Sequence, residues 1–433
     1  MSSNNRILYS CQAASISAMA APELQGSGLR SEARYPVERD NNIVHSDVNY
    51  GELIHGLQSV GITTNFNLEQ VFELGQIEIY ENIEGIPDVE VTLEKALDGY
   101  PLMYLMASTG VTSTNASGLL ARSKEQCDVR LGIFGEEFNN VAEAQSNAGN
   151  AEVEVYMSGM FISSVGYTFP VDGSFTESLT LVGNNKEWLT GDNVELTNAV
   201  VETFNGDDSP IALAAGSGGI QRREDLLLEY SVLPIGIDGV NGTGIGNAWK
   251  PRTDSFKYGV GTPEDPRGLY GEDLKLFKSS GLGVHVQNVS INTDFSREDI
   301  FELGRKNPYY RPAAFPVEVT CEIEAVTTSG DFITALEDGD PKLNGTPASG
   351  NNTSEENIHF VLRGGYSFDL GKKNRLSSVS YGGGDATGGN VSCTYSYTNF
   401  NDLDVKYIYH NHSGVMGFDN TALDFWFDNT VES

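Results

Sequence analysis

Hydrophobic and polar residues alternate along several short stretches of the chain. Between residues 60 and 66, Val, Ile, Thr and Phe alternate with Gly, Thr and Asn. The same period of two recurs at 89–94 and 317–324, where the intervening positions are mostly carboxylates. Because successive side chains of a strand point to opposite faces, these stretches predict half-buried strands. Their polar face carries Glu90, Glu94, Glu318, Glu322 and Glu324.

An internal repeat spans much of the chain. QSVGITTNFNLEQVFELG (58–75) matches QNVSINTDFSREDIFELG (287–304) at ten of eighteen positions, with a constant offset of 287 − 58 = 229. After a slip of one residue, VEVT (89–92) recurs at 317–320. Weaker matches join CDVRLGIF (127–134) to IHFVLR (358–363), and 167–181 to 397–409. A period this long indicates duplication of a whole domain.

A short helix is predicted after the first strand of each copy. Asn67 with Gln70, and Ser296 with Asp299, have the spacing of a helix N-terminus, and Gly75 and Gly304 stand where such a helix would stop. The apolar positions of this strand and helix predict a repeated core: Val60, Ile62, Phe66, Phe72 and Leu74 in the first copy, and Val289, Ile291, Phe295, Phe301 and Leu303 in the second.

These patterns predict a mainly β chain with two tandem β-sandwich or partial-barrel domains, each flanked by a short helix. We place the first domain at 1–235 and the second at 286–433, with a bridge at 236–285 that is rich in Gly and Pro. Further strands are expected at 156–169 and 421–428, and polar loops at 205–220, 338–357 and 382–390.

Composition adds a strong acidic balance. The 433 residues include 27 Lys and Arg against 60 Asp and Glu, a net charge of −33. Such a surface repels nucleic acid and anionic membranes. Two interpretations stay open, solubility alone or a surface that DNA passes without binding. The chain has no stretch of about 20 apolar residues and no basic segment followed by an apolar run at its start, so neither a membrane span nor a signal peptide is expected.

The sequence offers little catalytic or metal-binding chemistry. Its four cysteines are scattered without a CxxC pair, which argues against structural zinc and fits reduced thiols in a cytoplasm. His410 and His412 fit a surface loop, GTGIG (242–246) lacks the Lys-Ser/Thr of a phosphate-binding loop, and no GxSxG motif occurs. Tyr309, Tyr310 and Arg311 fit packing or an interface better than nucleic-acid stacking. We expect no enzyme activity, no cofactor and no metal.

Three segments resemble a family of bacteriophage virion proteins identified as tail tube proteins: residues 59–99, 167–188 and 297–326. The resemblance implies tail-tube-like β domains, six of which form a ring whose inner strands join into one continuous barrel. With two domains per chain, it implies trimeric rings with pseudo-sixfold symmetry that stack into a tube for DNA ejection. The chain would then act in the virion tail after synthesis in the host cytoplasm.

The implied partners are further copies of the chain, tail terminator and baseplate hub proteins, a contractile sheath where one exists, and double-stranded DNA that passes without stable binding. A baseplate hub or tube-capping protein with the same duplication is the main alternative. A receptor- or carbohydrate-binding virion protein is a more distant one. In a tube, the five glutamates named above are candidates to face the lumen; the opposite orientation, towards solvent or a sheath, is equally compatible with the pattern.

Overall fold

The computed structural model describes residues 7, 9–18, 52–75, 77–99, 102–108, 118–135, 151–194, 196, 220–226, 234, 284–304, 308–327, 333–335, 342–343, 355–362, 366–383 and 390–407. Several predicted features lie outside the described residues. They are the strand at 421–428, His410 and His412, GTGIG, and nearly all of the loop at 205–220 and of the bridge at 236–285.

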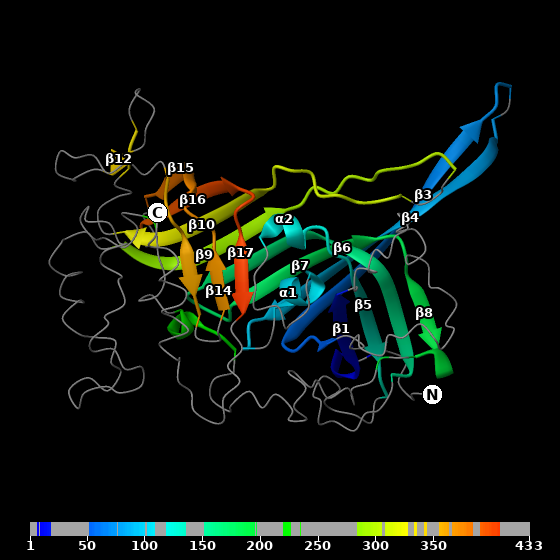
Figure 1. Cartoon of the computed structure of the whole chain (residues 1–433), viewed down its shortest axis with the longest axis horizontal. Helices are drawn as coiled ribbons and strands as arrows, with labels where there is room; N and C mark the ends of the chain where they lie inside the picture. The colour runs from blue at the N-terminus through cyan, green and yellow to red at the C-terminus, as the bar shows by residue number, and fades with distance from the viewer. Residues whose placement is uncertain are drawn as a thin grey trace, which may run out of the picture.

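Eight antiparallel strands form one continuous sheet across the molecule (Figure 1). Both halves of the chain contribute four of them, so the prediction of a mainly β chain is confirmed. Their order in space is β3 (Leu57–Phe72), β4 (Ile79–Ala96), β7 (Thr176–Gly183), β6 (Val153–Pro170), β9 (Val284–Asp294), β10 (Glu318–Thr327), β16 (Ser392–Phe400) and β15 (Arg375–Gly382).

Shorter elements accompany this sheet. The first half of β6 bends away and pairs with β5 (Cys127–Ile133) and β8 (Glu187–Thr190), and β5 continues to β1 (Gln12–Ala18) and β2 (Glu52–Leu53). In the second half, β13 (His359–Val361), β14 (Tyr366–Asp369) and β17 (Asp404–Tyr407) form a three-stranded sheet. The remaining elements are β11 (Ile333–Thr334), β12 (Lys342–Leu343), the helices α1 (Met103–Ser108) and α2 (Leu119–Arg122), and 3₁₀ turns at Tyr9–Cys11, Gly191–Asn193 and Arg223–Asp225.

The pairing pattern of the first half recurs in the second. The β3–β4 hairpin corresponds to β9–β10, and the neighbours β7 and β6 correspond to β16 and β15. The strand β5 corresponds to β13, the bent start of β6 to β14, and β8 to β17. The predicted match of CDVRLGIF with IHFVLR falls on β5 and β13, and the strand predicted at 156–169 lies within β6.

Two details of the predicted repeat need correction. Ile62 pairs with Val91, whereas its equivalent Ile291 pairs with Cys321, so VEVT and its recurrence are displaced by two residues in the fold. A shift of two keeps every side chain on its own face, so the sequence match does not reveal it. The match of 167–181 with 397–409 is also wrong. The counterpart of ISSVGY (162–167) in β6 is LSSVSY (376–381) in β15, and both strands bulge at the start of this motif.

One hydrophobic core contains residues from both halves. Val91, Leu93, Cys321 and Ile323 are at most 2 % exposed and line its sheet side. Aromatic rings fill it from the other strands. Phe169 contacts Phe368 at 5.2 Å and Phe360 at 6.2 Å between ring centroids, which joins β6 to the three-stranded sheet of the second half.

The helix α1 is anchored to this core by a buried carboxylate. Glu177 of β7 is fully buried and accepts hydrogen bonds from the backbone N–H groups of Met103 and Tyr104, at 2.7 and 3.0 Å. These two donors have no partner within the helix, because they belong to its first turn. Burial outweighs these bonds and raises the pKa of Glu177 to about 7.

The helices predicted at 67–75 and 296–303 are wrong. The first segment continues β3, pairing with β4 as far as Phe72 opposite Ile79, and the second is an extended arm with isolated bridges such as Ile300 to Tyr310. The described residues of the second half contain no α-helix. The cap-like residues at Asn67 and Ser296 and the glycines at 75 and 304 suggested helices, but these hairpins project beyond the body (Figure 1) and hydrogen-bond to themselves instead.

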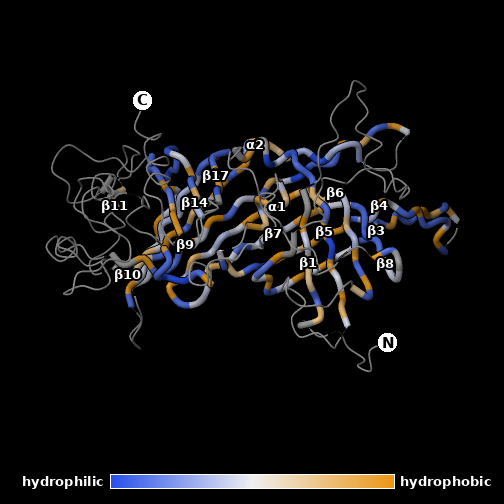
Figure 2. Tube along the Cα trace, turned by 60° about the horizontal axis from the view of Figure 1, so that its bottom comes forward, coloured by the Kyte–Doolittle hydropathy of each residue, from blue (hydrophilic) through white to orange (hydrophobic). Residues whose placement is uncertain are grey.

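Half of the predicted repeat core is therefore not core. Phe66, Phe72, Leu74, Phe301 and Leu303 are exposed, with Leu74 and Leu303 at 103 % and 105 %. Val289, Ile291 and Phe295 are buried, and Val60 and Ile62 are half-buried against the core. The exposed members lie on the protruding arms, where hydrophobic and hydrophilic residues are intermixed (Figure 2) and no other described element packs over them.

Candidate functional site: a polar sheet face between two unpaired edges

The eight-stranded sheet has one face on the core and one face free of it. The predicted acidic positions lie on the free face: Glu90, Glu94, Glu318 and Glu322 are exposed, and Glu324 is half-buried. Their strand neighbours on the other face are the buried Val, Leu, Ile and Cys residues of β4 and β10. Alternation along both strands thus separates core from carboxylate as the sequence predicts. That this face lines a lumen stays a prediction.

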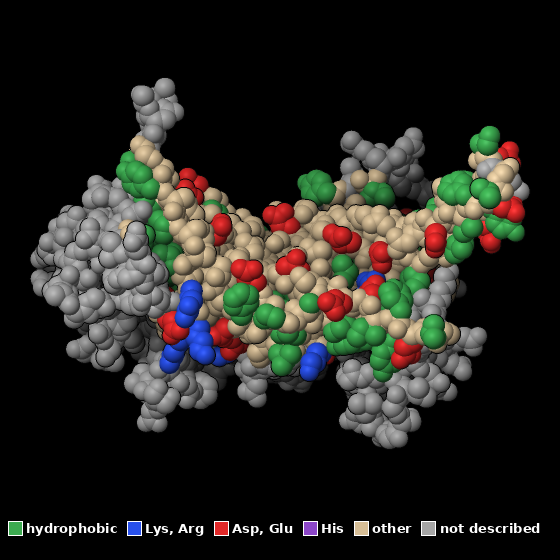
Figure 3. Space-filling model, turned by 90° about the horizontal axis from the view of Figure 1, so that it is seen from above, with side chains coloured by type: hydrophobic (Ala, Val, Ile, Leu, Met, Phe, Trp, Pro, Cys, Tyr) green, Lys and Arg blue, Asp and Glu red, His purple; other side chains and the backbone are tan. Residues whose placement is uncertain are grey.

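Small neutral side chains fill the rest of the free face. In β7, β6, β9 and β16 the corresponding positions are almost all Ser, Thr, Asn or Gly. The eight strands contain two Lys or Arg residues, Lys95 and Arg375. Lys95 is buried beside Asp98 at 3.0 Å, so Arg375, at the start of β15, is the basic side chain left at the surface of these strands. Figure 3 shows carboxylates scattered over one face of the molecule.

Both edges of the sheet are unpaired. In the part of the chain that the structure describes, β3 pairs on one side with β4 and β15 pairs on one side with β16. Each edge therefore presents a row of backbone N–H and C=O groups. Exposed edges of this length invite pairing with another strand. Sequence reasoning missed β15, where the bulge puts two serines between Leu376 and Val379 and interrupts the alternation that resumes to Tyr381.

Where the two halves of one chain meet, equivalent edges are already joined. Strand β6 pairs with β9 over seven residues, from Ser164 opposite Asp294 to Pro170 opposite Asn288, with Tyr167 opposite Ile291. The backbone N–H of Phe295 extends this ladder by donating to the carbonyl of Ser163 at 2.8 Å. Since β6 corresponds to β15 and β9 to β3, this junction joins the counterparts of the two unpaired edges.

The arm that follows β9 lies across the first half of the chain. Arg297 donates to the carbonyls of Ile162 and Ser123 at 2.8 and 2.7 Å, and its guanidinium stacks over Phe161 at 5.1 Å from the ring centroid. Desolvation lowers the pKa of Arg297 to about 10, which leaves it charged at neutral pH. Tyr310 adds an edge-to-face contact with Phe161 at 5.8 Å.

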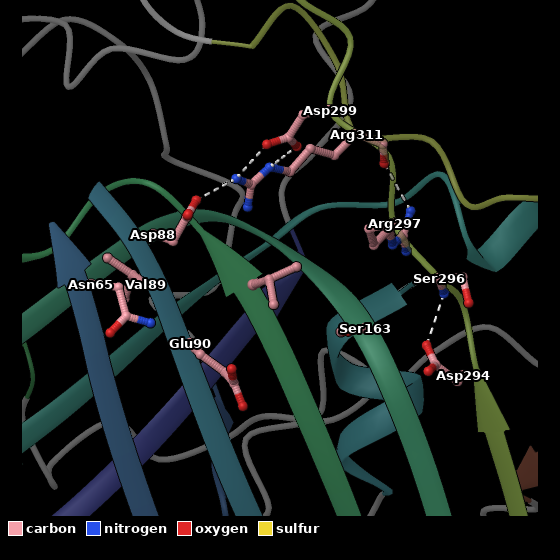
Figure 4. A pocket seen from close by; sticks show the side chains of 11 residues that line it. Asn65, Asp88, Val89, Glu90, Ser163, Asp294, Ser296, Arg297, Asp299 and Arg311 are labelled. Carbon is pink, nitrogen blue, oxygen red and sulfur yellow. Dashed lines mark hydrogen bonds and ion pairs between the residues drawn. The ribbon is translucent and has the colours of Figure 1, made fainter. Parts of the chain in front are cut away.

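An ion-pair network also holds the arm that follows β9 against the first half of the chain. Arg311 points between two carboxylates, pairing with Asp88 of β4 at 2.9 Å and with Asp299 of its own arm at 2.5 Å (Figure 4). Arg311 is 7 % exposed, so both pairs are partly shielded from water. These residues surround a small polar pocket that also includes Asn65, Glu90 and Asp294. The described residues contain no cluster of side chains suited to a metal ion, and no described helix is long and apolar enough to cross a membrane.

Comparison with known proteins gives distant structural similarity only. No protein-family model and no curated protein matches the chain. Among solved structures, similarity is found to the tube-terminating cap of the anti-feeding prophage (TM-score 0.27, 12 % identity, 44 % of this chain and 95 % of the other) and to the baseplate of the same particle, 6-fold symmetrised (0.26, 9 %, 43 % and 97 %). A third is the sheath–tube complex of an extracellular contractile injection system in the extended state (0.23, 10 %, 44 % and 95 %). TM-scores this low do not establish a shared fold.

Proposed function

We propose that this chain is a structural subunit of a phage-type tail tube, and that copies of it join edge to edge, β15 of one to β3 of the next, into a closed ring. The observation that carries the proposal is a pair of identical residues with opposite burial. Phe66 and Phe295 are equivalent in the repeat, yet Phe66 is 72 % exposed and Phe295 is fully buried. The two phenylalanines differ in their neighbours: β6 and its surroundings cover β9, whereas no described strand pairs with the outer edge of β3.

The internal junction also supplies a register for the junction between chains. Tyr167 faces Ile291 across β6 and β9, and their equivalents are Tyr381 and Ile62. Tyr381 is 54 % exposed and Ile62 is half-buried, whereas Tyr167 and Ile291 are both fully buried. We therefore propose that Tyr381 of one chain lies opposite Ile62 of the next. Across the same junction, the N–H of Phe66 donates a hydrogen bond to the carbonyl of Ser377.

Charge supports the same pairing. The β3–β4 arm carries five glutamates and no Lys or Arg between residues 66 and 84. In the assembled ring this arm lies over Lys372 and Lys373, in the turn before β15, and over Arg375 at the start of that strand. Within one chain, Arg297 on the second arm stacks on Phe161 of β6. Between chains, the equivalent positions hold Leu68 on the first arm and Arg375 at the start of β15. The arginine and its apolar partner therefore exchange sides. The stem of Arg375 can cover Leu68 while its charge meets the glutamates.

The number of chains follows from the resemblance of the sequence to tail tube proteins, whose rings contain six domains. Two halves per chain give a trimer with pseudo-sixfold symmetry. The free polar face of the sheet would then line the lumen of the ring. Its Glu side chains repel duplex DNA that passes during ejection, and its neutral Ser, Thr and Asn side chains carry no charge that would bind it. Lysine or arginine at these positions would hold the phosphates instead.

A crosslinking experiment tests the register directly. The double variant Ile62→Cys, Tyr381→Cys should form disulfides between chains and give a closed covalent trimer on non-reducing gels. The four native cysteines are buried, so they do not compete. The control is Ile62→Cys with Val379→Cys, two residues out of register, whose backbones are too far apart for a disulfide. Equal crosslinking of both pairs, or of neither, would reject the proposed edge pairing.

Electron microscopy tests the assembly itself. The purified chain should form rings with six similar lobes and the mass of three chains. Rings of six chains, with one half of each chain outside the wall, would contradict the trimer. Abundance in purified particles then separates a tube subunit, present in many copies, from a hub or cap, present in few.

A further inference from the structure

The two free edges of the sheet carry opposite charge. Beside β3, the arm formed by residues 66–84 holds five glutamates and no Lys or Arg, and all five glutamates are exposed. We call this segment the acidic arm. Beside β15, three exposed basic side chains stand within four residues, Lys372, Lys373 and Arg375, and we call this segment the basic turn. Figure 3 shows carboxylates on the protruding arm and a cluster of Lys and Arg at the opposite end of the molecule.

The junction inside the chain distributes its charges the other way round. There the basic groups stand on the arm that follows β9, where Arg311 pairs with Asp88 of the first half at 2.9 Å. The bend of β6 that receives this arm, residues 157–161, contains no charged residue. In the proposed junction between chains, the carboxylates stand on the arm and the basic groups on the half that receives it. Side chains therefore distinguish two junctions that share one pattern of strand pairing.

Two unpaired edges can meet in more than one way. An exposed antiparallel edge can pair with a second copy of itself, so a twofold dimer of two β3 edges or of two β15 edges competes with the head-to-tail pairing. Either dimer would occupy an edge that a closed ring needs. Backbone hydrogen bonds form in all three arrangements, so the choice between them depends on the side chains beside the strands.

Charge disfavours both twofold arrangements. The β3–β4 hairpin contains eight carboxylates between residues 57 and 96, and its one Lys or Arg residue is the buried Lys95. Two such hairpins placed side by side repel each other whatever their register. Pairing of two β15 edges leaves both acidic arms without a countercharge. Neither dimer therefore compensates the glutamates of the arm.

Head-to-tail pairing gives the acidic arm its countercharge. The register proposed above continues to Leu68 opposite Arg375. It thereby brings the next glutamates of the arm, Glu69 and Glu73, alongside the lysines of the basic turn. A further carboxylate, Glu318, lies on strand β10 of the receiving half. The positive charge of this contact is therefore supplied by the basic turn.

We propose that the acidic arm and the basic turn are the specificity determinants of assembly, which let β3 of one chain accept β15 of the next and prevent pairing of like edges. The partner is a second copy of this chain, so the inference rests on the proposed function. It adds to that function the reason why the contact is head to tail. A head-to-tail contact can repeat until a ring closes, whereas a twofold contact ends at a dimer.

Charge reversal on each side of the contact tests the proposal. The arm variant carries Glu69→Lys and Glu73→Lys. The turn variant carries Lys372→Glu and Lys373→Glu, and the swap variant carries all four changes. All four side chains are exposed, so the fold of the free chain should not depend on them. Size-exclusion chromatography with light scattering measures the mass of the assemblies that each full-length chain forms.

The arm variant and the turn variant should each weaken ring formation by roughly tenfold or more, because every junction then opposes like charges. The swap variant should recover ring formation, because opposite charges meet again. Where the turn variant no longer forms rings it should be a monomer, since its acidic arms still repel each other. The control, Glu94→Lys with Glu322→Lys, changes net charge as the arm variant does, at exposed positions on strands inside the sheet, and should form rings like the wild type.

The outcomes separate this inference from the proposed function. Normal rings in either single reversal, or no recovery in the swap variant, would overturn the inference and leave the ring intact. An equal loss in the control would assign the effect to net charge and overturn it as well. Dimers of the turn variant would show that like edges pair despite their charge. A wild type that forms no rings would reject the proposed function, and the inference with it.

Discussion

Arg311 and Asp88, 223 positions apart in the chain, form an ion pair of 2.9 Å that joins the second half of the molecule to strand β4 of the first. Their halves repeat each other, yet the described residues contain no equivalent contact, because the arm of the first half packs on no other described element. The pair marks the one junction between repeats that a single chain contains.

Removal of this arginine should loosen that junction. In Arg311→Ala, Asp88 and Asp299 lose their partner in a shielded site, so the free energy of unfolding should fall by about 1–3 kcal/mol. Arg375→Ala is the control, because Arg375 is largely exposed and pairs with exposed Glu355 at 3.5 Å. It should change unfolding of the free chain by less than about 0.5 kcal/mol. Denaturant unfolding of both variants measures the difference; equal losses would mean that Arg311 stabilises no more than a surface charge.

The repeated phenylalanines should respond to truncation according to their position. Phe295→Ala removes a fully buried ring and should cost about 3–5 kcal/mol in unfolding free energy. Phe66→Ala, Phe72→Ala and Phe301→Ala alter exposed rings and should each stay within about 0.5 kcal/mol for the free chain. Phe66→Ala should instead weaken ring formation, which size-exclusion chromatography with light scattering detects. A large loss of stability in Phe66→Ala, with ring formation unchanged, would contradict the proposed edge contact.

The buried carboxylate of β7 should make stability fall as pH rises. Glu177 has a folded-state pKa of about 7 against an ordinary value of 4.5, so between these values the native state keeps a proton that the unfolded chain has lost. Its contribution is present below about pH 4.5 and is lost as pH rises towards 7, by roughly 3 kcal/mol in total. His55 acts in the opposite sense, because burial lowers its pKa to about 4 and its stabilisation is lost as pH falls.

The variant Glu177→Gln separates the two effects. It keeps His55, but the amide that replaces the carboxyl group at position 177 cannot ionise. The stability of the variant should therefore exceed that of the wild type by more at pH 8 than at pH 5. Denaturant unfolding at both pH values measures the change, with the exposed Glu94→Gln as control. A constant difference between wild type and Glu177→Gln across this range would show that the buried carboxylate does not titrate there.

Local pattern in the sequence predicts the strands and misassigns the arms. Period-two alternation identifies β4, β9 and β10 and separates their core residues from their glutamates, because one face of each strand meets the core of the same chain. In residues 67–75 the capping pattern and the glycine that follows favoured a helix, but no described element covers the apolar residues of this segment, and its backbone pairs with β4 as a hairpin instead. The match of ISSVGY with LSSVSY was readable in the sequence and identifies β15, the edge strand that sequence analysis missed.

The orientation of the acidic face is the prediction that tests the conduit. Since duplex DNA carries one negative charge per about 1.7 Å of its axis, a wall of carboxylates keeps it at a distance and hydrated, and a basic wall would bind it at every ring.

Glu94→Cys and Glu322→Cys place a reactive thiol on the free face of β4 and β10, in a chain whose own cysteines are all buried. In the free chain both a small maleimide and a maleimide on a large polymer should react. In stacked rings the small reagent should still enter the lumen and label both sites, and the large one should be excluded. Labelling of assembled stacks by the large reagent would place these strands on the outer wall, and the five glutamates would then face solvent or a sheath rather than DNA.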